Sequence, residues 1–143
     1  MKTVSKWLGV VSAVTLGITS LAVLANETKK FSKTYDFSQS GSINLDNING
    51  NVEVSGWDKD EILLEYTITA DSADDIENVK VEIDHSERDF DVEVDIDSGG
   101  FMNWGGSSGE VSFSLKVPQG ASLKSIESVN GNIKIVSVSG EIK

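Results

Sequence analysis

INGNVEV, residues 48–54, recurs position by position as VNGNIKI, residues 129–135. In each copy an Asn-Gly-Asn turn lies between an apolar residue and a short strand in which apolar and polar residues alternate. Glycine and asparagine tolerate positive φ, so both turns are predicted to be tight. Nine residues after Gly131 the theme returns as VSGEI, residues 138–142. The chain is therefore read as a series of glycine-punctuated strands.

Short, even spacing of such units is typical of a β-solenoid, in which each unit turns at its glycine and lays a strand beside the preceding one. A plain hairpin meander is the alternative, because Asn-Gly is also a favoured hairpin turn. We predict an all-β domain, specifically a β-solenoid or β-helix-like stack of short strands, with a β-sandwich or meander as the alternative.

Most of the remaining chain alternates with period two, as strands with one buried face do. β-Branched residues dominate the apolar positions, as strands prefer. A short helix is predicted from Ala73 to about Asn78, because Ser72 and Asp75 resemble a capping box. The positions predicted to face a core are Tyr35, Phe37, Ile43, Leu45, Val52, Val54, Ile62, Leu64, Tyr66, Ile68, Val79, Val81, Ile83, Phe90, Val92, Val94, Ile96, Val111, Phe113, Leu115, Val117, Ile133 and Ile135.

The first 25 residues have the order of a secretory signal peptide. Lys2 and Lys6 form a basic start, the run from Trp7 to Ala25 is uncharged, and the segment ends on Val-Leu-Ala. An uncleaved membrane anchor is the alternative, but Gly, Ser and Thr dilute the apolar run, which favours cleavage. No cysteine follows, which excludes a lipoprotein signal. We expect a signal peptide at 1–25 and a β-strand-repeat domain at 26–143.

The C-terminal residues bear on the predicted stack of strands. Lys143 directly follows Ile142, without a polar cap or closing turn. A stacked β array needs its last strands covered, because an open edge invites pairing with another chain. We expect the array to be truncated at its C-terminus, with use of the edge for association as the alternative.

Composition excludes several functions. The 143-residue chain has a net charge of −11, and removal of residues 1–25 takes away two lysines and no acid, leaving −13. This acidic excess opposes binding to nucleic acid and docking on anionic lipid. There is no cysteine, so disulfides, thiol nucleophiles and zinc-thiolate sites are excluded. Solubility or a cationic partner suits this charge better.

Two longer segments resemble the bacterial putative-adhesin family of β-strand-repeat extracytoplasmic proteins. One is GSINLDNINGNVEVSGWD, residues 41–58, and the other is VSFSLKVPQGASL, residues 111–123. The resemblance covers nearly all of residues 31–143. It implies a β-helix-like protein that is secreted or held in the envelope. This chain stops where family members usually continue through several more glycine-punctuated repeats.

No catalytic, metal or cofactor residue is predicted. His85 is the only histidine, and its neighbour Ser86 would point to the opposite face of a strand, without a nucleophile-elbow sequence. Five carboxylates alternate with apolar residues, which indicates a solvated strand face. Calcium binding is the alternative, although no Asp-x-Asp-x-Asp-Gly loop is present. These carboxylates are Asp89, Asp91, Glu93, Asp95 and Asp97.

The glycine-rich segment 98–109 is predicted to be a long hairpin loop between two alternating strands. Its side chains Phe101, Met102 and Trp104 are candidate contacts for a ligand or partner, since aromatic residues stack on sugars and anchor proteins. The alternative is that they fold back over the end of the core. Trp57 is predicted to pack in the core or against a turn.

The leading hypothesis is a non-enzymatic extracytoplasmic β-repeat protein, an adhesin-like binding module located in the periplasm, in the envelope or outside the cell. A structural or regulatory envelope component that binds another envelope protein is the alternative, and a carbohydrate-active β-helix enzyme is less favoured. Expected partners are a surface glycan or an envelope protein, with edge-strand self-association. No cofactor, nucleic acid or stable membrane span after signal cleavage is expected.

Overall fold

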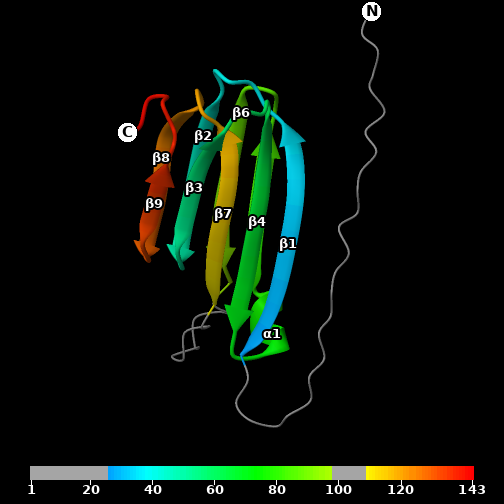
Figure 1. Cartoon of the computed structure of the whole chain (residues 1–143). Coiled ribbons are helices and arrows are strands. Elements are labelled where there is room, and N and C mark those ends of the chain that lie inside the picture. The colour runs from blue at the N-terminus through cyan, green and yellow to red at the C-terminus, as the bar shows by residue number, and fades with distance from the viewer. Residues whose placement is uncertain (1–25, 98–108) are drawn as a thin grey trace, which may run out of the picture.

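The alternating segments form strands in the part of the chain that the structure, a computed structural model, describes, residues 26–97 and 109–143. One short helix interrupts them (Figure 1). The elements are β1 (Glu27–Asp36), β2 (Ser42–Asn49), β3 (Val52–Trp57), β4 (Glu61–Ala70), α1 (Ala73–Glu77), β5 (Val79–His85), β6 (Asp89–Ile96), β7 (Glu110–Pro118), β8 (Ser122–Asn130) and β9 (Ile133–Val136).

The strands form two sheets. A five-stranded sheet has the order β1-β4-β7-β3-β9, and a four-stranded sheet has the order β5-β6-β2-β8. Figure 1 shows the five-stranded sheet in front, with β2 and β6 behind it and α1 at one end. The all-β prediction, including the one short helix, is confirmed.

Inward-facing residues of both sheets form one hydrophobic core. Phe90 of β6 is fully buried, and its ring meets Tyr35 of β1 and Phe37 edge to face, at centroid distances of 5.0 and 6.2 Å. Aromatic pairs prefer this geometry, so the three rings tie the two sheets together. Nearly all the predicted core positions are buried or partly buried; Ile133 is exposed.

Three connections cross from the four-stranded to the five-stranded sheet: β2 to β3, β6 to β7 and β8 to β9. The strands of these units are parallel to one another, β2 between β6 and β8, and β3 between β7 and β9. The other pairs, β1–β4, β4–β7 and β5–β6, are antiparallel. Both sheets are thus open and mixed, and a solenoid is not shown.

The predicted hairpin across residues 98–109 is wrong. β6 pairs with β2 and β5, whereas β7 pairs with β3 and β4 in the other sheet. Period-two alternation on both sides of a loop fits a crossing between sheets as well as a hairpin, because both strands bury one face in either case. The connection therefore joins the two layers.

The helix α1 follows its predicted signals. Ser72 is its N-cap, and the Ser72 hydroxyl oxygen accepts a hydrogen bond from the Asp75 amide at 3.1 Å. The hydroxyl also donates to the Asp75 carboxylate at 2.7 Å. Ile76 is buried, which supplies the tertiary support that five residues need to remain helical.

Candidate partner-binding edge

The two copies of the Asn-Gly-Asn segment lie side by side. In the four-stranded sheet Asn49 is paired with Asn130, and in the five-stranded sheet Val52 is paired with Ile133. The sequence offset is 81 residues in both pairs, so the whole second copy is stacked in register on the first. β8 and β9 are consequently the last strands of their sheets at one and the same end of the molecule.

Glycine at the centre of each turn allows the two copies to approach closely. Gly50 has φ of +120°, and a Cβ on it would lie 2.2 Å from the Val111 carbonyl oxygen. A Cβ on Gly131 would lie 1.9 Å from the Gly50 carbonyl oxygen. Both neighbours are backbone atoms that cannot swing aside. The stacking therefore requires glycine at this position of each copy.

Side-chain amides connect the turns. The Asn49 amide donates to the Gly109 carbonyl at 3.3 Å, and the Asn130 amide donates to the Asn49 side-chain oxygen at 2.9 Å. The Asn51 side-chain oxygen accepts from the Asn132 backbone amide at 3.0 Å. The second turn thus donates twice to the first, and the side-chain oxygens of Asn49 and Asn51 accept these bonds.

Asn47 supports the turn from inside and was not predicted. It is fully buried, and its amide donates to the carbonyl oxygens of Gly50 and Val111 at 3.2 and 2.9 Å. Ser128, its counterpart in β8, donates to the same Gly50 oxygen at 2.9 Å. The burial of Asn47 could have been predicted from the alternation in β2, because Asn47 follows the inward-facing Ile43 and Leu45 at period two.

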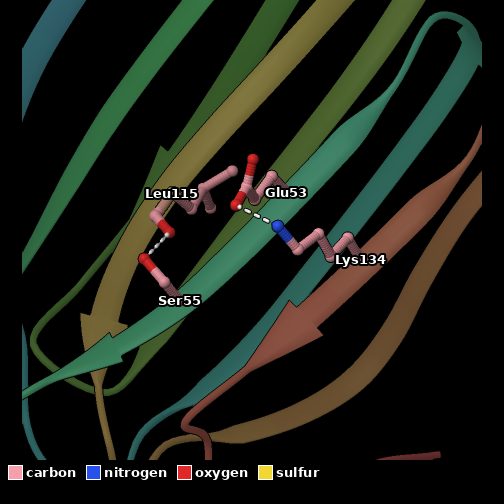
Figure 2. A network of polar contacts seen from close by, with 4 residues as sticks. All are labelled: Glu53, Ser55, Leu115 and Lys134. Carbon is pink, nitrogen blue, oxygen red and sulfur yellow. Dashed lines mark hydrogen bonds and ion pairs between the residues drawn. The ribbon is translucent and has the colours of Figure 1, made fainter.

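The strands that follow the turns also interact through charge. Figure 2 shows the Lys134 ammonium of β9 meeting a Glu53 carboxylate oxygen of β3 at 3.2 Å. On the other side of β3, the Ser55 hydroxyl donates to the Leu115 carbonyl of β7 at 3.5 Å, a long bond (Figure 2). The ion pair is solvent-exposed, so it favours one register more than it adds stability.

Apolar side chains remain exposed at this end of the sheets. Within residues 26–97 and 109–143, the large apolar side chains classed as exposed are Val129 (74%), Ile133 (41%), Val136 (39%) and Ile142 (51%). The counterpart of Ile133 one copy inward, Val52, is covered and only 1% exposed. We call residues 126–136, the outer part of β8 with its turn and β9, the open edge.

The residues after β9 cover only the start of β8. Ile142 forms a parallel bridge to Leu123, where the Leu123 amide donates to the Glu141 carbonyl at 2.8 Å and the Lys143 amide donates to the Leu123 carbonyl at 3.1 Å. Gly140 passes close to the Ala121 carbonyl, 2.0 Å from where its Cβ would be. The third glycine unit thus returns to the four-stranded sheet and leaves the open edge uncovered.

His85 and Ser86 each contact other residues of the fold. The Ser86 hydroxyl oxygen accepts from the backbone amides of Arg88 and Asp89 at 3.2 and 3.0 Å, which closes the turn before β6. The His85 ring meets the Tyr35 ring at 4.6 Å between centroids. Each side chain therefore has a structural role.

The carboxylates of β6 lie on the exposed face of the four-stranded sheet, as predicted for Asp89, Asp91, Glu93 and Asp95, and Asp97, directly after the strand, is also exposed. Asp91 accepts from the Asn44 amide at 2.6 Å. A shallow hollow on this face is lined by Asp91 and Glu93 together with Asp46, Glu82 and Asp84. Among the described residues no group of three or more His, Cys, Asp or Glu side chains has an arrangement that could hold a metal ion.

Two tyrosines have shifted pKa values. Burial raises the pKa of Tyr35 above 10.0. Burial also raises the pKa of Tyr66, and the nearby Tyr35 adds to this rise. The Tyr66 ring is stacked on Phe31 at 4.6 Å. Both groups are packing residues of the five-stranded sheet, and the shifts follow from that packing.

The predicted aromatic contacts Phe101, Met102 and Trp104 lie outside the described residues. Trp57 is described and packs against a turn, as predicted: its indole nitrogen donates to the Glu61 carbonyl at 2.7 Å. The Lys59 ammonium lies 4.7 Å from its ring centroid. The predicted signal peptide, residues 1–25, is likewise outside the described part. No helix within the described residues is long and apolar enough to cross a membrane.

No family model and no curated protein matches the chain. Among solved structures it is similar to a putative cell adhesion protein from Clostridium sporogenes ATCC 15579, at 11% identity and a TM-score of 0.38, over 77% of this chain and 59% of that one. It is also similar to a putative adhesin from Bacteroides fragilis NCTC 9343, at 13% identity and a TM-score of 0.37, over 75% of this chain and 53% of that one. The chain thus spans little more than half the length of either protein.

Proposed function

We propose that this chain is an exported, non-enzymatic binding module with an adhesin-like role, and that a partner protein binds at the open edge. One observation carries the proposal: an unpaired strand edge and exposed apolar side chains occur at the same place. Edge strands present backbone amides and carbonyls that can pair with another strand. The exposed Val129, Ile133 and Val136 lie on the same strands and turn.

The parallel units support a finer proposal for the architecture. β6–β7, β2–β3 and β8–β9 each cross between the sheets in the same direction and are stacked in that order. We take them as three rungs of an incomplete solenoid whose inner end is closed by the antiparallel strands β1, β4 and β5. In such stacks each unit contacts its neighbours, so the outermost unit is the natural place for a further contact.

The acidic composition supports a protein partner, since it opposes nucleic acid and anionic lipid. The described polar residues support a non-enzymatic role: His85 and Ser86 have structural partners, and the carboxylates of β6 face solvent. Export rests on the sequence of residues 1–25.

The test is binding of labelled protein, residues 26–143, to washed envelope from the bacterium that produces it. Ile133→Lys places a charge on the open edge and is expected to lower binding at least tenfold, because edge charges block strand addition. Thr34→Lys is the matched control: it adds the same charge on β1, the opposite edge of the five-stranded sheet, at an exposed position. Equal losses for both variants would contradict the proposal.

A further inference from the structure

We propose that the ligand of the open edge is a polypeptide segment of the form [Val/Ile]-Asn-Gly-x-[Val/Ile], where x is any residue except proline, supplied by a partner protein and added in parallel register as one further rung. This inference rests on the proposed function and specifies its ligand. The molecule already contains the interaction it invokes, because residues 129–136 are added to residues 48–55 in this manner.

Glycine is the most selective requirement. Gly131 fits against the Gly50 carbonyl only because it has no Cβ, which would lie 1.9 Å from that oxygen. A ligand added outside β9 would meet the Gly131 carbonyl in the same way as Gly131 meets the Gly50 carbonyl now. A ligand with a side chain at this position would meet backbone atoms, as Gly131 would if it were substituted. The turn of the ligand must therefore contain glycine there.

Asparagine provides the polar contacts. The Asn130 amide is already used as a donor to Asn49, at 2.9 Å. The Asn130 side-chain oxygen is then placed to accept from an asparagine amide of the ligand, as the Asn49 oxygen accepts now. In a repeat of the contact between Asn51 and the Asn132 backbone amide, 3.0 Å, the Asn132 side-chain oxygen would accept from the backbone amide of the ligand residue after the glycine, which any residue except proline provides.

The strand after the turn provides apolar area and a charge preference. Ile133, 41% exposed, would be covered as the matching residue of β3, Val52, is covered now. Lys134 directly follows Ile133, and its ammonium group meets the Glu53 carboxylate on the inner side of β9 (Figure 2). A carboxylate between the two β-branched residues of the ligand would meet Lys134 from the outer side. Val-Glu-Val is therefore preferred to Val-Lys-Val.

The probe is a synthetic peptide of residues 45–55, LDNINGNVEVS, which has every required feature. Binding to isotope-labelled protein, residues 26–143, is followed by NMR at physiological salt, which screens the repulsion between two acidic chains. We expect saturable shifts confined to β8, β9 and their turn, with a Kd of about 1 mM or tighter. A peptide with Gly50→Val is expected to bind at least tenfold more weakly, because of overpacking against backbone.

A charge exchange tests the register. The peptide with Glu53→Lys should bind wild-type protein about threefold more weakly than the unaltered peptide, and this preference should reverse on Lys134→Glu protein. Lys134 is an exposed residue, so its substitution leaves the fold intact, which circular dichroism verifies. Equal binding of the glycine and valine peptides, or an unchanged charge preference on Lys134→Glu protein, would overturn the inference.

Two further results separate this inference from the proposed function. If no peptide binds but Ile133→Lys still prevents envelope binding, the ligand class is wrong and the proposed function stands. If Ile133→Lys has no effect on envelope binding either, both are wrong. A concentration-dependent dimer that Ile133→Lys dissociates, and for which the peptide does not compete, would make a second copy of the chain the occupant and overturn the inference.

Discussion

Substitution of Gly50 by alanine tests the turn on which the stacked units depend. Two costs add. Gly50 has φ of +120°, and a non-glycine residue held in such a backbone region is destabilised by about 1–3 kcal/mol. The new Cβ would also lie 2.2 Å from the Val111 carbonyl oxygen and 2.6 Å from its carbon, so the backbone must shift. Overpacking of this kind costs about 1–3 kcal/mol.

The shift would further weaken the contacts made by the Gly50 backbone. Its amide donates to the Asn130 carbonyl, and its own carbonyl accepts from Asn47 and Ser128. Loss of one such bond costs about 1 kcal/mol. We expect Gly50→Ala to lower the free energy of unfolding by roughly 3–7 kcal/mol, out of the 5–15 kcal/mol typical of a domain.

Urea denaturation followed by circular dichroism measures this loss. Gly109→Ala is the control, since its Cβ would meet the end of a side chain, Val79 Cγ2 at 2.6 Å, and no left-handed φ is involved. We expect about 1 kcal/mol for the control. A loss at Gly50 no larger than at Gly109, with both proteins folded, would refute the claim that backbone contact selects glycine at the turn.

Three other predictions follow from single features. Ser72→Ala removes the N-cap of α1 and should lower the free energy of unfolding by about 1 kcal/mol, measured by thermal denaturation, while Thr28→Ala on exposed β1 should change it little. Because the pKa values of Tyr35 and Tyr66 are raised, the folded state retains their protons more strongly than the unfolded state does. Their contribution to stability is therefore full below pH 10.0 and falls as the pH rises above it. Tyr35→Phe should reduce that fall, measured by denaturation at a series of alkaline pH values. Mass spectrometry of the protein exported by a bacterial host should find a mature chain beginning at Asn26, and retention of residues 1–25 would support the anchor alternative.

Local pattern predicted the strands because one buried face imposes period two. It also identified residues 48–54 and 129–135 as copies of one segment, but it did not predict that the two copies lie side by side. The start of β8 was missed because its alternation is broken: Leu123 is opposite Ile43 but Ser125 is opposite Asn44, which leaves Lys124 as an extra residue. A bulge of this kind shifts the period by one residue.

The pairing of strands that are far apart in the chain could not be predicted from the sequence. The antiparallel contact of β1 with β4 and the assignment of β6 and β7 to different sheets depend on the global arrangement rather than on local propensity. The candidate site could be predicted only in outline. The exposed side chains and the direction of the asparagine contacts require the register.

The central claim is that the open edge, residues 126–136, is where the partner binds. Hydrogen–deuterium exchange of the protein, residues 26–143, free and bound to envelope, tests it most directly. Amides of an edge strand that face solvent exchange rapidly and become protected when another strand adds to them. We predict that binding slows exchange across residues 126–136 and leaves β1, the opposite edge, unchanged. Protection on β1, or unchanged exchange across residues 126–136 in the bound protein, would contradict the account.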